Sequence, residues 1–263
     1  MRLDIQHETR YRYTVPVNYS IQHLRLTPRA EPRQRVLNWR IDAPGQLRRS
    51  VDAYGNVTHT MVLTAPRDEI RLVVAGSVEV GSAPLSTGEH DLSPLVFTVP
   101  TPLTEAEESV REFAAHHLQS ARRVEDLLAL AEAICGTVAY QSGITEVTST
   151  AAQALGIGRG VCQDHAHLFI ACCHVLGVPA RYVSGYVDPG HDEPAASHAW
   201  ADAWIEGSGW TSVDVTHRIA ALDRHCRLAI GRDYLSAAPV RGVRTGGGEE
   251  SMHVAVAVRM DHQ

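Results

Sequence analysis

Cys162 stands where a cysteine can act as a nucleophile. It follows a glycine-rich turn at Gly158 to Gly160 and lies in the first residues of a helix predicted from about Gly160 to Leu176. The unpaired N–H groups and the dipole at the start of a helix favour an anion, so a thiol placed there loses its proton more readily. The same N–H groups can stabilise an oxyanion. We therefore take Cys162 as a candidate nucleophile.

A thiolate nucleophile needs a general base close by, and the base needs an acceptor that orients it. His198 is the candidate base, in the segment S-H-A-W-A-D-A-W-I (197–205), whose alternation predicts a strand. One face of this strand carries His198 and Trp200, and the other carries the alanines. Because alanine is small, we expect the second face to pack closely, against the helix of Cys162.

Two acidic residues are open as the partner of His198. Asp202 lies on the same strand, but same-face neighbours four residues apart are about 13 Å from each other. Asp214 lies on the next predicted strand (210–216), and a turn centred on Glu206 would place it opposite His198. A turn centred between Gly207 and Ser208 would shift the pair by about three residues, or about 10 Å. We favour Asp214 and leave the register open.

Three more residues are candidates for substrate contacts. Gln163 follows the nucleophile and could donate a hydrogen bond to the oxyanion. Gly160 has no side chain, which would leave an open approach for a substrate carbonyl. Trp200 could line a substrate groove, although packing near the strands explains an aromatic residue there equally well.

A metal centre is not expected, although the chain has 15 histidines. His165 and His167 are two residues apart on a helix and diverge, whereas ligands on one helical face are three or four residues apart. The consecutive Cys172, Cys173 and His174 also point apart. We therefore predict neither a metal nor another cofactor.

Two domains are predicted. Residues 1–95 contain short alternating segments separated by Pro, Gly or Asn, with a predicted hairpin tip at Tyr54-Gly55-Asn56, which indicates a β-sandwich-like domain. The composition over about 81–102 is that of a linker. Residues 96–263 place helices first and strands after them, which is an α+β arrangement.

Helix signals in the second domain are local. Thr104 is the predicted N-cap of its first helix, with Glu107 as the capping-box partner. A second helix is expected over 124–138, with Cys135 as a core residue. Residues 242–250 are expected to form a flexible loop before a last strand.

Charge and composition exclude several kinds of partner. The net charge is -6 and no basic cluster marks a face for nucleic acid. The first residues carry no apolar signal region, and no apolar run reaches the length of a membrane span. The five cysteines are irregularly spaced, which favours free thiols. We expect a cytoplasmic protein, and the sequence does not indicate its oligomeric state.

The combination of motifs resembles the bacterial transglutaminase-like proteins, in the branch described as candidate cysteine proteases of the papain-like superfamily. The resemblance rests on R-G-V-C-Q-D-H-A-H-L (159–168), G-V-P-A-R-Y-V-S-G-Y-V (177–187), S-H-A-W-A-D-A-W-I (197–205), G-W-T-S-V-D-V-T-H (209–217) and G-R-D-Y (231–234). R-Y-R-Y and L-R-L-T-P-R near the start also look like this branch's β-rich N-terminal region.

The resemblance implies a papain-like core in which a helix bearing the cysteine packs on an antiparallel sheet. It places the nucleophile at Cys162, the base at His198 and the orienting acid at Asp214. Val215 stands where a proline commonly follows the acid, and His165 stands where an aromatic residue is frequent. Because His165 follows the nucleophile so closely, we include it among the candidates for substrate contacts.

These residues predict acyl transfer through a thioester, on a peptide or carboxamide bond of a peptide or protein substrate. Water as the acceptor makes the chain a protease or amidase, which we favour because an intracellular site meets water unless it is built to exclude it. An amine co-substrate would make it a protein-glutamine transamidase. The chain has no lysine, which fits a cross-linker that avoids itself, but codon bias explains this equally well. A non-catalytic peptide-binding module is the alternative of another class.

Overall fold

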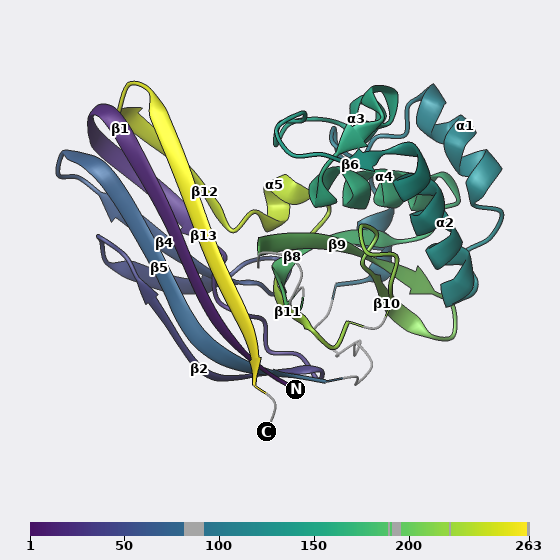
Figure 1. Cartoon of the computed structure of the whole chain (residues 1–263), viewed down its shortest axis with the longest axis horizontal. Coiled ribbons are helices and arrows are strands. Elements are labelled where there is room, and N and C mark those ends of the chain that lie inside the picture. The colour runs from purple at the N-terminus through teal and green to yellow at the C-terminus, as the bar shows by residue number, and fades with distance from the viewer. Residues whose placement is uncertain (82–91, 189, 191–195, 221, 262–263) are drawn as a thin grey trace.

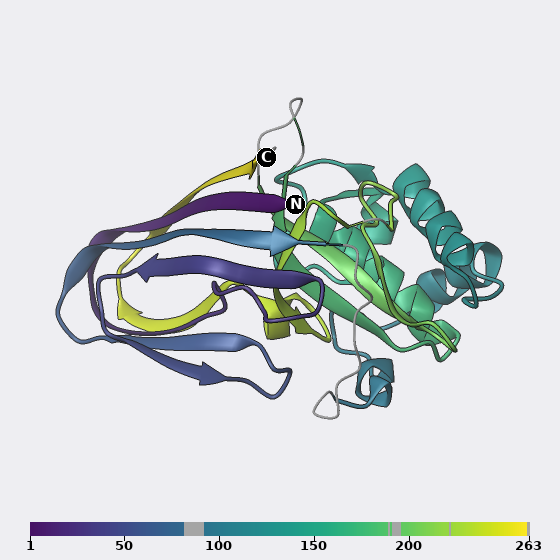
Figure 2. The same cartoon turned by 90° about the horizontal axis from the view of Figure 1, so that it is seen from below.

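The computed structural model describes residues 1–81, 92–188, 190, 196–220 and 222–261. Residues 82–91 of the expected linker therefore lie outside the described residues. Figures 1 and 2 show a long bent sheet at one end of the molecule, helices at the other end and a smaller sheet between them. Among the described residues, no helix has the length and apolar character needed to cross a membrane.

The helices are η1 (Pro94–Thr98), α1 (Glu108–His117), α2 (Val124–Thr137), α3 (Ala151–Ile157), α4 (Cys162–Val175) and α5 (Tyr234–Ala237). The strands are β1 (Arg2–Leu24), β2 (Gln34–Asp42), β3 (Leu47–Val51), β4 (Val57–Leu63), β5 (Arg67–Val80), β6 (Ala139–Tyr140), β7 (Arg159–Gly160), β8 (Ala180–Val187), β9 (Ala196–Ile205), β10 (Gly209–Val213), β11 (His225–Gly231), β12 (Val240–Gly246) and β13 (Glu250–Asp261).

The long sheet is organised around β1. Its order is β2-β5-β1-β4-β3, and β12 and β13 also pair with β1. The first half of β1 lies between β5 and β13, and the second half lies between β4 and β12. The sequence predicted several short strands over this stretch. One strand of 23 residues forms instead, because partners on both sides continue past Pro16, where irregular register absorbs the missing N–H.

The end of the chain returns to this sheet. Residues 242–250 were expected to be a loop, and that prediction is wrong for 242–246, which belong to β12. The glycines there suggested flexibility, but β1 offers backbone partners to the whole segment, and a hairpin with Gly247 and Gly248 at positive φ leads into β13. The predicted division at residue 95 thus separates strands that share one sheet.

The small sheet has the order β10-β9-β8-β11 and carries α4 on one face. Ala199, Ala201 and Ala203 of β9 lie in one core cluster with apolar residues of α4, as the sequence predicted. Their methyl groups let the helix approach the sheet closely. The predicted helix over 124–138 is confirmed by α2. The predicted start of the first helix at Thr104 was wrong, since α1 begins at Glu108. The hydroxyl of Thr104 accepts a hydrogen bond from the backbone N–H of Thr101 and therefore does not cap the helix.

A loop residue and a strand residue of the long sheet hold β11 in place. Asn56 accepts from the backbone N–H of Ile230 at 2.9 Å and donates to its carbonyl at 2.8 Å. Gln34 accepts from the backbone N–H of Arg227 at 2.7 Å and donates to its carbonyl at 2.8 Å. These side chains complete the ladder of an edge strand, so the two sheets form one connected framework.

A buried ionic cluster lies on β8, β9 and β11. The carboxylate of Asp202, which is fully buried, accepts from Arg181 at 2.8 Å, from Arg227 at 2.6 Å and from Ser212 at 2.7 Å. Burial would raise the pKa of Asp202, but the charges of Arg227 and Arg181 outweigh burial and hold it well below its usual range. Asp202, the rejected partner of His198, therefore has a structural role.

Removal of this charge should destabilise the chain strongly. In Asp202→Asn, the buried guanidinium of Arg181 loses its counter-ion and that of Arg227 keeps only Glu31, so we expect a loss of about 3–5 kcal/mol in urea unfolding at pH 7. Because the folded-state pKa of Asp202 is depressed, its contribution is present above about pH 4 and fades as the pH falls, so the variant should show a smaller acid-dependent loss. Glu79→Gln, which breaks an exposed pair with Arg35, is the matched control and should change stability little. Equal effects of the two substitutions would contradict the expectation.

Candidate active site

Cys162 is the first residue of α4, as the sequence predicted. The turn before it is held by Asp164, whose Oδ2 accepts from the backbone N–H of Val161 and from the Thr145 hydroxyl, both at 2.7 Å. A side chain at Gly160 would place its Cβ 2.6 Å from that same Oδ2. Gly160 is therefore needed to admit the capping carboxylate, which differs from the expected open approach for a substrate.

His198 and Asp214 are brought into direct contact. Nε2 of His198 lies 2.8 Å from Oδ2 of Asp214. The pairing of β9 with β10 places Ser212 opposite Asp202, so the turn is centred on Gly207 and Asp214 is two residues out of register with His198. The ladder ends at Val213, and Asp214 enters a turn closed by a backbone bridge to Ile219. This turn lets the carboxylate reach His198, so a bulge is not required.

The charges at the site favour an imidazolium. Burial would lower the pKa of His198, but hydrogen bonds with Asp214 and Cys162 raise it to about 10. Burial would raise the pKa of Asp214, but its hydrogen bonds to three histidines hold it far below its usual range. His198 therefore carries a positive charge beside the carboxylate of Asp214 across the neutral pH range.

Asp214 is shared by two histidines that the sequence analysis did not single out. Oδ2 of Asp214 lies 2.7 Å from Nδ1 of His217 and 2.8 Å from Nε2 of His225. The backbone N–H of His217 also donates to Oδ1 at 3.2 Å. The spacing of His217, three residues after the acid in a turn, was a usable signal. His225 arrives on β11, and nothing local in the sequence predicts that approach.

The other predicted contact residues are buried. Gln163 is 8% exposed and donates to the carbonyl of Val147 at 3.2 Å. His165 lies 2.9 Å from the carbonyl of Val138 and 3.0 Å from the hydroxyl of Thr216, two residues past Asp214. His165 thus connects α4 to the turn of Asp214, and the substrate roles of both residues stay predictions.

Trp200 forms a wall behind the histidines. It is 1% exposed, and its ring lies against His198 at 6.3 Å and edge-on to His225 at 5.1 Å between ring centroids. A Cβ at Gly185, on the neighbouring strand β8, would lie 2.5 Å from this ring. The packing interpretation of Trp200 therefore holds, and the indole does not line an open groove.

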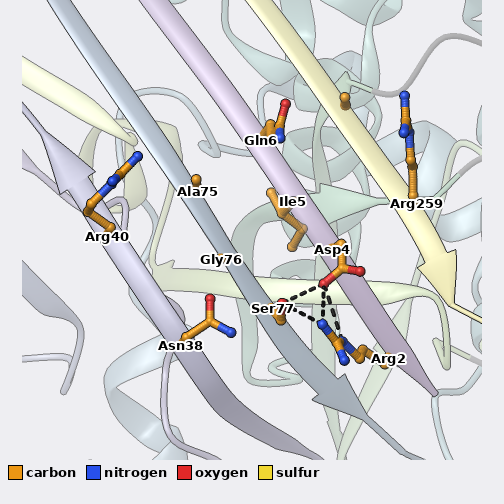
Figure 3. Close-up of a pocket in the computed structure, with 11 residues that line it drawn as sticks. Arg2, Asp4, Ile5, Gln6, Asn38, Arg40, Ala75, Gly76, Ser77 and Arg259 are labelled. Atoms are coloured by element: carbon orange, nitrogen blue, oxygen red, sulfur yellow. Dashed lines mark hydrogen bonds and ion pairs between the residues drawn. The ribbon is translucent and has the colours of Figure 1, made fainter.

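A separate hollow of about 620 Å³ lies on the long sheet, away from α4. Figure 3 shows its floor on β1, β2, β5 and β13, where Arg2 and Ser77 both bond Asp4. Its lining contains neither cysteine nor histidine. The residues suited to acyl transfer are therefore at the start of α4 and on the small sheet.

Comparisons with known proteins agree with this arrangement. The bacterial transglutaminase-like N-terminal region matches residues 3–79, and the transglutaminase-like superfamily matches residues 111–215, which include Cys162, His198 and Asp214. An uncharacterized protein of Mycobacterium leprae is 30% identical over 98% of this chain and 98% of its own length.

Two further relatives are named more fully. The crystal structure of a candidate cysteine protease from Cytophaga hutchinsonii has the same fold, with a TM-score of 0.81 at 22% identity over all of this chain and 92% of that one. A protein-glutamine gamma-glutamyltransferase of Pseudomonas aeruginosa is 32% identical over 34% of this chain and 15% of its own length. The chain is therefore a bacterial member of the transglutaminase-like superfamily, with that family's N-terminal region joined to its core.

Proposed function

We propose that this chain is a cysteine-dependent acyl transferase that acts on a peptide or carboxamide bond, with hydrolysis as its reaction. The observation that carries the proposal is the position of His198, whose Nε2 lies 2.8 Å from Oδ2 of Asp214 and whose pKa is raised by Cys162 as well as by Asp214. This is the geometry that nucleophilic catalysis by a thiolate requires. The cysteine's place at the start of α4 supports the same role.

The proposed reaction has two halves, the formation of a thioester and its hydrolysis. The thiolate of Cys162 attacks the carbonyl carbon, and the backbone N–H groups at the start of α4 stabilise the oxyanion. His198 donates its proton to the leaving nitrogen as the C–N bond breaks, which leaves a thioester. Water then attacks the thioester and gives a proton to His198, and the acid product and the thiolate are released. Asp214 holds the ring in orientation throughout.

The acyl acceptor separates two versions of this function. Water gives a protease or amidase acting on a peptide or protein, which is the version we favour. An amine co-substrate gives a transamidase, and the relative named as a glutamyltransferase is the observation in its favour. Both versions share every step up to the thioester, so the same residues serve either one.

Selective alkylation tests the activated thiol. Cys135 and Cys162 are both partly exposed, but burial raises the pKa of Cys135, whereas Cys162 faces an imidazolium. Iodoacetamide at pH 6 should therefore label Cys162 first, as read by peptide mass spectrometry. Asp214→Asn removes the buried negative charge that helps to keep His198 protonated, so we expect slower labelling of Cys162 at pH 6.

Two variants complete the alkylation experiment. His198→Gln should also slow the labelling of Cys162, and Asp68→Asn, at an exposed position on β5, should not. Circular dichroism spectra of each variant establish that the fold is kept. Labelling of Cys162 that is no faster than that of Cys135, or that is unchanged in both site variants, would refute the proposed role of the triad.

Product analysis tests the reaction itself. A library of peptides and amides is incubated with the full chain, with and without a primary amine, and the products are identified by mass spectrometry. We expect hydrolysed acids in both mixtures and none with Cys162→Ala. If amine adducts predominate, the reaction is transamidation and not hydrolysis. Absence of any Cys162-dependent product, despite a reactive thiol, would favour the binding-module alternative.

A further inference from the structure

Four side chains from three segments converge on one point beside Cys162. Each of the three imidazole nitrogens named above, on His198, His217 and His225, lies 2.7–2.8 Å from the same Oδ2 of Asp214. The four atoms all lie within 4.8 Å of one another. Catalysis by the triad needs only one of these histidines, so the other two are available for a further role.

The donor set is one that zinc prefers. Three imidazole nitrogens and one carboxylate oxygen form a tetrahedral shell with Zn–N distances of roughly 2.0–2.1 Å, which places the ligand atoms roughly 3.4 Å apart. The carboxylate oxygen now occupies the centre of the three nitrogens. It has to withdraw by roughly an ångström to become the fourth ligand. His217, whose side chain is 35% exposed, lies on the open side and can move to admit an ion.

His225 supplies an independent indication. Its Nδ1 is buried and has no hydrogen-bond partner among the described residues. A ring whose second nitrogen is unconstrained can hold its proton there, which frees the lone pair of Nε2 for a metal. The side chain of His225 is 3% exposed, so the packing around it keeps Nε2 pointed toward Asp214.

We propose that one zinc ion binds to His198, Asp214, His217 and His225, and that the bound ion abolishes the reactivity of the Cys162 thiol. The inhibitory half of this proposal rests on the proposed function. The binding half does not, because the fold brings the four side chains together whatever the chain catalyses.

Inhibition follows from the tautomer that the metal imposes. Coordination takes the lone pair of Nε2 of His198, and the proton that Nε2 carried leaves to solvent. The remaining proton stays on Nδ1, so the neutral ring has no free nitrogen that can take a proton from a thiol or from water. Asp214 meanwhile bonds the metal and no longer orients the ring. Removal of the ion by a chelator reverses both changes.

The test measures zinc directly, in a chain that cannot catalyse. Cys162→Ser removes the thiol as a competing ligand, and zinc is titrated into this full-length protein against a chromophoric chelator. We expect one ion per chain. Adding His217→Gln or His225→Gln should weaken binding at least about 100-fold, since even the loss of an outer-shell partner costs up to that much. His253→Gln, on the exposed face of β13, is the matched control and should bind like the parent.

Inhibition is read separately, in the wild-type chain. Zinc at one equivalent should stop the iodoacetamide labelling of Cys162, and a chelator should restore it. Failure of the Cys162→Ser protein to bind stoichiometric zinc, or equal binding by both histidine variants, overturns the site. Binding without any loss of labelling overturns the inhibitory role. None of these results bears on whether the metal-free chain transfers acyl groups, so the proposed function is tested apart from this inference.

Discussion

The candidate site depends on one buried oxygen, Oδ2 of Asp214. A carboxylate taken out of water is costly unless donors surround it, and here three imidazoles do so. The donors come from β9, from the turn after β10 and from β11, so all three segments must be in place before the charge is compensated. The same oxygen gives His198 its high pKa and sets the orientation of the ring toward Cys162.

Close packing elsewhere in the fold helps to bring the three histidines together around Asp214. Alanines on β9 let α4, which carries Cys162, pack closely on the strand that carries His198, and Gly185 leaves room for the indole of Trp200 behind the histidines. Asp202 holds β8, β9 and β11 together by charge, and Asn56 reaches across from the long sheet to fix β11. The N-terminal region thus contributes to the placement of His225, although none of its described residues belongs to the site.

Local patterns were enough to predict the parts that depend on local physics. The apolar periodicity of α2 and α4, the alternation of β9 and the glycine turn before Cys162 all correspond to observed elements. The partnership of His198 with Asp214 needed the turn after β10, whose geometry spacing cannot reveal. The predictions failed where pairing between distant strands determines the structure. β12 forms because it pairs with β1, and His225 reaches Asp214 because it lies on β11. The cytoplasmic location, the partners and the boundary at residue 95 stay predictions.

The continuity of β1 has a consequence for biogenesis. Its first half pairs with β5 soon after both are synthesised, but its other edge waits for β13, more than 200 residues later. Until the ribosome has delivered that last strand, a long row of backbone groups on β1 stays open to pairing with another chain. Stalled or truncated synthesis products should therefore be far more prone to aggregate than the finished protein, whatever the state of the core.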